Sequence, residues 1–84
     1  MLFVFQADSR AAFTMAGTLI PLDIAFFAAD GSLVDRFTMV PCLSEPCPSY
    51  SAVGPYLFAL EVPAGGFEGV GDPRLDPGSV PGRS

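Results

Sequence analysis

Residues 18–40 decide the fold, and they read TLIPLDIAFFAADGSLVDRFTMV. Residues 19–27 and 32–40 are rich in β-branched and aromatic side chains, and they flank an Ala-Ala-Asp-Gly segment. Strands favour such side chains, and the glycine of a short loop can adopt a positive φ. This stretch therefore predicts an antiparallel β-hairpin at the centre of the domain.

A register that pairs Phe27 with Ser32 gives this hairpin one apolar face. That face would hold Leu22, Ile24, Phe26, Leu33, Phe37 and Met39, with Asp35 as the single charged residue. Because a slip of one residue turns every side chain to the other face, the apolar pattern constrains the register. The same register sets Asp23 opposite Arg36, where an opposite-charge pair contributes roughly 0.2–1 kcal/mol.

The composition indicates one small folded domain and excludes several classes of partner. Half of the 84 residues are hydrophobic and eight are Phe, which favours a packed core despite nine Gly and nine Pro. The net charge is −5, and the only basic residues are four scattered arginines. Binding to nucleic acid or to an anionic membrane surface needs clustered cations, so we expect neither. The uncharged runs are too short and too interrupted by Pro and Gly for a transmembrane segment.

The rest of the chain predicts further strands and a tail. Residues 2–5 form an apolar run, residues 11–15 could continue as a second strand, and residues 56–62 alternate in the manner of a strand. Three prolines and three serines favour a loop between residues 40 and 54. We expect an all-β domain, a small β-sandwich or barrel-like structure around the hairpin, over residues 1–68. Residues 69–84 are rich in Gly and Pro and are expected to form a mobile tail.

Four motifs, in this order, resemble the prokaryotic DUF192 family of domains of unknown function. They are MLFVF at residues 1–5, TLIPLDIAFF with its Ala-Asp-Gly turn, MVPC followed by CPSY, and YLFALEVPAG. The resemblance extends to about residue 67. It implies a compact β-barrel-like or β-sandwich domain with no established enzymatic activity, and family members are often exported or membrane-anchored. The first residues themselves lack the basic segment and cleavage site of a signal peptide.

One departure from the family pattern leads to an expectation about partners. Family members usually begin well before the MLFVF element, with a segment that contains Arg-Gly-Leu-Met, so the chain resembles a domain truncated at its first strand or two. A missing strand would leave an open sheet edge, and open edges pair with other strands. We therefore expect a homo-oligomer or aggregation through such an edge.

Cys42 and Cys47 are the pair most suited to covalent chemistry. Closing so short a loop with a disulfide would stabilise the domain by about 2 kcal/mol on the chain-entropy model. A redox-active thiol pair and two inert reduced thiols are the alternatives, although no basic residue lies nearby in sequence to activate a thiol. A closed zinc site needs four Cys or His ligands, and the chain has two Cys and no His, so no metal is expected unless subunits share one.

Asp23 is the carboxylate best placed for function, because it lies in an apolar run beside a proline. It could serve as a general acid or base, pair with a cross-strand cation, or cap a turn. The chain has no histidine to act as a base, no phosphate-binding Gly-rich loop and no serine-hydrolase motif, so the sequence does not support catalysis. No cofactor is expected.

These observations favour a non-catalytic module that binds a ligand or a protein partner. The predicted binding residues are Asp23, Arg36, Tyr50 and Tyr56, and Phe13 and Phe67 are further aromatic candidates for a ligand groove. The alternative is an enzyme that uses Asp23 as acid or base, or Cys42 and Cys47 as a thiol pair. A third reading is one part of a larger assembly completed by the missing strand.

Overall fold

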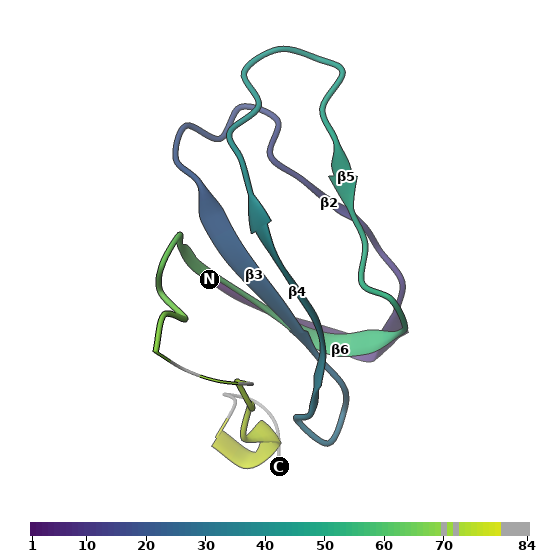
Figure 1. Ribbon diagram of the computed structural model, residues 1–84. Coiled ribbons are helices and arrows are strands. Elements are labelled where there is room, and N and C mark those ends of the chain that lie inside the picture. The colour runs from purple at the N-terminus through teal and green to yellow at the C-terminus, as the bar shows by residue number, and fades with distance from the viewer. Residues whose placement is uncertain (70, 72, 80–84) are drawn as a thin grey trace.

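The computed structural model describes residues 1–69, 71 and 73–79, and it is all-β (Figure 1). Four antiparallel strands form one sheet in the order β1-β6-β3-β4: β1 (Leu2–Ser9), β6 (Tyr56–Pro63), β3 (Leu22–Phe27) and β4 (Leu33–Met39). A second sheet consists of β2 (Phe13–Thr14) and β5 (Ser49–Tyr50). The larger sheet is open, with β1 and β4 as its edges, so the all-β prediction is confirmed and the structure is not a closed barrel.

Helical structure is limited to one short element in the part of the chain that is described. This element is the 3₁₀ helix η1 (Pro77–Ser79). Across the same residues, we find no helix with the length and apolar character needed to cross a membrane.

The predicted hairpin is present as β3 and β4, but its predicted register is wrong. A bulge lies between Phe26 and Phe27, so that Phe27 pairs with Leu33 whereas Phe26 pairs with Asp35. Val34 is the extra residue of the bulge, and Ser32 stays in the turn, where its carbonyl accepts the Ala28 N–H at 2.9 Å. Because Ser32 stays in the turn and Val34 is unpaired, the pairing beyond the bulge is shifted by two positions from the predicted register.

The shifted register changes the partners of the charged residues. Asp23 lies opposite Thr38, and Arg36 lies opposite Ala25, so the predicted cross-strand pair of Asp23 and Arg36 is wrong. A shift by an even number preserves the faces, and Ile24 still shares a face with Phe37. Leu33 is the exception, because the bulge returns it to the opposite face.

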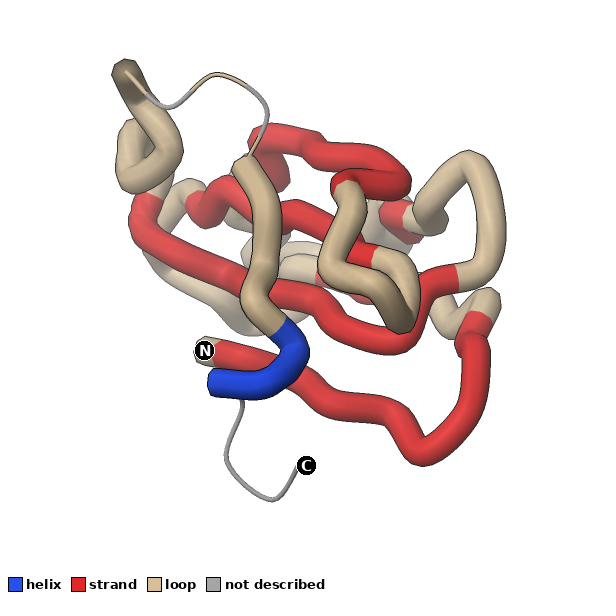
Figure 2. Tube along the Cα trace, turned by 90° about the horizontal axis from the view of Figure 1, so that it is seen from below, coloured by secondary structure: helices blue, strands red, loops and turns tan. Residues whose placement is uncertain are grey.

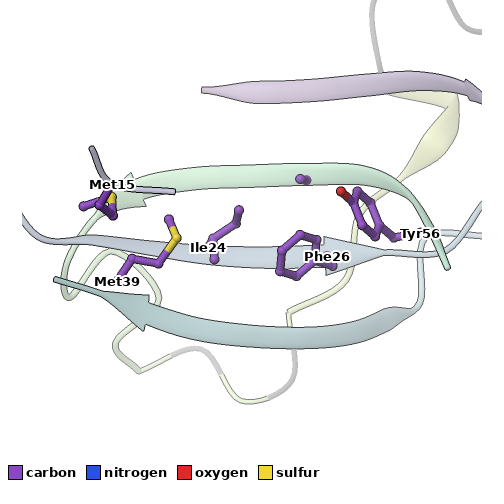
Figure 3. Packing of buried hydrophobic residues seen from close by; sticks show 6 residues of the cluster. Met15, Ile24, Phe26, Met39 and Tyr56 are labelled. Carbon is purple, nitrogen blue, oxygen red and sulfur yellow. The ribbon is translucent and has the colours of Figure 1, made fainter. Parts of the chain in front are cut away.

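The main core fills the space between the two sheets. Its buried members are Met15, Ile24, Phe26, Met39, Tyr56 and Ala59. Figure 3 shows Met15, Ile24 and Met39 toward one end of this cluster and Phe26 and Tyr56 toward the other. The rings of Phe26 and Tyr56 have centroids 4.6 Å apart, and Phe13 of β2 packs edge-on against Phe3 of β1 at 5.1 Å. Aromatic packing therefore holds the small sheet against the large one.

The opposite face of the larger sheet carries a second apolar cluster. It contains Ala25, Phe27, Leu57 and Phe58, and Phe67 and Leu75 from the C-terminal segment pack against it. The Leu75 N–H donates to the Gly31 carbonyl at 3.0 Å, and the Arg74 guanidinium donates to the Asp30 carbonyl at 3.1 Å. This C-terminal segment thus lies beside the hairpin turn, and Figure 2 shows its path to η1.

Other sequence-based boundaries differ from the structure in detail. β1 continues to Ser9, past an irregularity in its pairing with β6, although the sequence predicted only residues 2–5. The predicted loop at residues 40–54 contains β5, and β6 matches its prediction closely. Residues 70, 72 and 80–84 of the predicted tail lie outside the described residues, and the domain boundary near residue 68 stays a prediction.

Candidate functional site

A cleft of about 400 Å³ lies between the β3–β4 hairpin and the turns at residues 64–69. Its wall mixes charged, polar and aromatic side chains. The lining residues are Asp23, Arg36, Phe37, Thr38, Gly65, Phe67 and Glu68.

The strand register explains how the polar residues reach this cleft. Asp23 and Thr38 are directly opposite each other, and Arg36 is two residues from Thr38 along β4. Side chains at alternate positions of a strand share one face, so the three polar groups emerge together on the face opposite the main core. The structure therefore brings the two charged residues that the sequence selected, Asp23 and Arg36, into one cleft without pairing them across the strands.

Asp23 holds the cleft together through both of its carboxylate oxygens. Oδ1 accepts the Thr38 hydroxyl at 2.8 Å, and Oδ2 accepts the backbone N–H of Gly65 at 2.9 Å. The first bond joins β3 to β4, and the second fixes the turn at residues 64–69 against the sheet. This pattern gives Asp23 a clear structural role at the wall of the cleft.

Arg36 contributes the positive charge of the cleft. Its Nη1 donates to the Gly71 carbonyl at 3.0 Å, which orients the guanidinium. A guanidinium carries five N–H donors, and this is the one bond that the Arg36 side chain makes to the described residues. The described residues therefore leave most of its donors to a ligand.

Aromatic and acidic groups complete the wall of the cleft. Phe67 is half-buried and packs on the second apolar cluster, and Phe37 packs edge-on against Phe26 with centroids 6.1 Å apart. Glu68 is exposed, and its carboxylate accepts no hydrogen bond from the described part of the chain. The Phe37 ring thus belongs to the main core, and a ligand in the cleft would meet the Phe67 ring, a guanidinium and a carboxylate.

The two predicted tyrosines lie away from the cleft. Tyr56 is fully buried in the main core, where its hydroxyl donates to the Ala11 carbonyl at 2.7 Å. Burial raises the pKa of the Tyr56 hydroxyl. Tyr50 packs against Phe37 at 6.2 Å between ring centroids, and its hydroxyl accepts the Val40 N–H at 3.4 Å. A binding role for these tyrosines stays a prediction.

Cys42 and Cys47 form the predicted disulfide, also outside the cleft. The Cys42 carbonyl accepts the Gly17 N–H at 3.0 Å, so the disulfide loop is joined to the segment that follows β2. The described residues include no free cysteine. Across these residues, no group of three or more His, Cys, Asp and Glu side chains is arranged to hold a metal ion.

Sequence reasoning missed four residues of the cleft: Phe37, Thr38, Gly65 and Glu68. Strand alternation could have identified Thr38, because it shares a face with Arg36. No signal in the sequence shows that the turn at residues 64–69 folds over the hairpin, since this position depends on the long-range bond between Asp23 and Gly65.

Comparison with known proteins gives one positive result. No curated protein and no solved structure matches the chain. The family model DUF192, described as "Uncharacterized ACR, COG1430", matches residues 1–74. The matched region contains all six strands and every residue that lines the cleft. The chain therefore belongs to the DUF192 family.

Proposed function

We propose that the protein is a non-catalytic binding module, and that its cleft takes a small molecule with a carboxylate group and an apolar body. The observation that supports this proposal is the Arg36 guanidinium, which lines the cleft, is oriented by Gly71 and makes no other hydrogen bond to the described residues.

The size and lining of the cleft suit such a ligand. Small-molecule sites typically measure about 300–1,000 Å³ and combine apolar walls with a few polar groups. The volume of about 400 Å³ falls at the lower end of that range, and Phe67 supplies an apolar surface. A compact molecule fits better than an extended one.

The Arg36 guanidinium gives the cleft one site for an anionic group of the ligand, beside the carboxylates of Asp23 and Glu68. A guanidinium binds carboxylates through two parallel hydrogen bonds, which are stronger than bonds between neutral groups. The chain as a whole has a net charge of −5, and Arg36 is the positively charged residue in the lining of the cleft. The Glu68 carboxylate can accept an amino or hydroxyl group of the same molecule.

The hydrogen bonds of Asp23 favour a binding role for the cleft over acid–base catalysis by this carboxylate. Both of its oxygens already accept hydrogen bonds from the fold, from Thr38 and from Gly65. A proton transfer to or from this carboxylate would weaken the contacts that keep the cleft in shape.

The test is a screen of small carboxylates by ¹H–¹⁵N NMR with the isotope-labelled protein. We expect the amide shifts of Thr38, Gly65 and Phe67 to move together on titration. Arg36→Gln should weaken binding at least about tenfold, which corresponds to about 1.4 kcal/mol. Arg10→Gln is the matched control, because it removes the same charge from an exposed residue outside the cleft. Shifts centred elsewhere, or equal losses in both variants, would contradict the proposal.

A further inference from the structure

We infer that the cleft binds a free amino acid in its zwitterionic form, and that the side chain of this amino acid is apolar. The inference rests on the proposed function, which assigns a carboxylate and an apolar body to the ligand, and it adds a protonated amino group that pairs with Glu68.

The described lining of the cleft holds more negative than positive charge. Asp23 and Glu68 are carboxylates, and Arg36 is the guanidinium. A ligand whose only charged group is a carboxylate is attracted by Arg36 but repelled by the two acidic residues, and charges near a protein surface act on each other more strongly than in bulk water. An ammonium group on the same ligand turns that repulsion into attraction. The lining therefore matches a ligand that carries both signs of charge.

The positive and the negative group of the lining do not neutralise each other. Within the described part of the chain, Arg36 donates to the Gly71 carbonyl at 3.0 Å and forms no ion pair with Glu68. Arg36 lies two residues from Thr38 along β4, which is a rise of about 7 Å. Because one cleft of about 400 Å³ holds these groups, one small molecule can reach both. The described residues leave the two charges to that molecule.

The two carboxylates lie beside Gly65, but they differ in what they already bind. Asp23 accepts the Gly65 N–H at 2.9 Å and the Thr38 hydroxyl at 2.8 Å. The Oε2 atom of Glu68 lies 3.8 Å from the point that a Cβ on Gly65 would occupy, and its carboxylate accepts no hydrogen bond from the described residues. Glu68 is therefore the acceptor for an ammonium group, and Asp23 adds its charge from nearby.

A free amino acid has the groups that this lining requires. It carries a carboxylate and an ammonium on one carbon, with a side chain that diverges from both. The carboxylate would take parallel N–H groups of Arg36, the ammonium would donate to Glu68, and an apolar side chain would cover Phe67. A peptide holds its two terminal charges at opposite ends of the chain, so a cleft of this size favours the free amino acid.

The first experiment compares ligands of matched shape on the unmodified chain. Phenylalanine is titrated beside phenylpropionate, which lacks the amino group, and phenethylamine, which lacks the carboxylate. Leucine, isocaproate and isopentylamine form a second set with a smaller side chain. The readout is the movement of the Thr38, Gly65 and Phe67 amide shifts in ¹H–¹⁵N NMR spectra. In at least one set, we expect the amino acid to bind at least about fivefold more tightly than either partial ligand.

These outcomes separate the inference from the proposed function. If the carboxylates move the three amide shifts and bind as tightly as the amino acids, the inference is wrong and the proposed function stands. If the amines bind as tightly as the amino acids, the carboxylate contributes nothing and both are wrong. Both are also wrong if no ligand of either set moves these shifts.

The second experiment removes the proposed partner of the amino group. Glu68→Gln should weaken the binding of the amino acid about fivefold and should not weaken the binding of the matching carboxylate, because it removes an attraction for one and a repulsion for the other. Asp8→Asn is the control, since it removes a negative charge from an exposed residue outside the cleft. Unchanged binding of the amino acid to Glu68→Gln, or an equal loss for both ligands, would overturn the inference.

Discussion

The Oδ2 atom of Asp23 accepts the backbone N–H of Gly65 at 2.9 Å, although the two residues are 42 positions apart. This bond joins β3 to the turn at residues 64–69, and the Thr38 hydroxyl occupies the other oxygen of the same carboxylate. One side chain thus connects three segments of the chain. These contacts fix the wall of the cleft.

Asp23→Asn should lower the free energy of unfolding by about 2 kcal/mol, because an amide offers one oxygen to two donors and hydrogen bonds to charged groups are the stronger ones. Thr38→Val is the control, since it removes only the hydroxyl bond and should cost about 1 kcal/mol. Urea denaturation measures both. Equal stability of Asp23→Asn and the unmodified chain would contradict the role given to this carboxylate.

Gly31→Ala should destabilise the fold more than Gly17→Ala. Both glycines have positive φ, 87° for Gly31 and 74° for Gly17, so each variant costs about 1 kcal/mol in backbone strain. A Cβ at Gly31 would also collide with the Leu75 carbonyl, whereas a Cβ at Gly17 meets no atom within 4 Å. We expect a further loss of about 2 kcal/mol for Gly31→Ala, at the upper end of the usual effect of a point mutation. Faster hydrogen exchange at the Leu75 amide should accompany it, and equal effects at both positions would be inconsistent with this packing.

Removal of the disulfide should lower the free energy of unfolding by about 2 kcal/mol, the value expected for so short a loop. The variant is Cys42→Ser combined with Cys47→Ser, and thermal unfolding with and without reductant is the measurement. Reductant should lower the melting temperature of the unmodified chain and leave the variant unaffected. No response of the unmodified chain to reductant would show that the bond adds no stability.

Glu61 should make the domain less stable as the pH rises. Burial raises the pKa of its carboxyl above the ordinary value of 4.5, and the Met1 ammonium opposes this rise more weakly. The folded state therefore favours the protonated form, and the stability that it provides is complete below pH 4.5 and is lost as the pH rises through the folded pKa.

The test of this pH dependence is Glu61→Gln, which keeps the residue neutral throughout. It should match the unmodified chain below about pH 4 and exceed its stability near pH 7, as measured by urea denaturation at each pH. Glu68→Gln is the control, because it removes the same charge from an exposed position. The same gain in both variants would attribute the effect to net charge instead of burial.

The sequence predicted the parts of the fold that local patterns govern. The hairpin, β6 and the disulfide follow from β-branched runs, alternation and cysteine spacing, and all three are present. The register required knowledge of the bulge at Val34, which has no glycine or other local signature. β5 was missed because it is two residues long and forms only against Phe13 and Thr14, far away in the chain.

The candidate site was predictable to a smaller degree. Asp23 and Arg36 were selected for their charge within apolar strands, and both line the cleft. Tyr50 and Tyr56 were selected because aromatic side chains often line ligand grooves. Aromatic residues also build cores, and the sequence does not distinguish the two uses. The far wall of the cleft comes from long-range contacts that no periodicity reveals.

The pairing of β1 with β6 has a consequence for folding during synthesis on the ribosome. The hairpin of β3 and β4 is local and can form while synthesis continues, but Leu2 finds its partner Leu60 only after most of the chain has emerged. Until then β1 lacks its strand partner, β6. Closure of the sheet is therefore a late and slow event, and β1 is the segment that chaperones of extended apolar chains would bind in the interval.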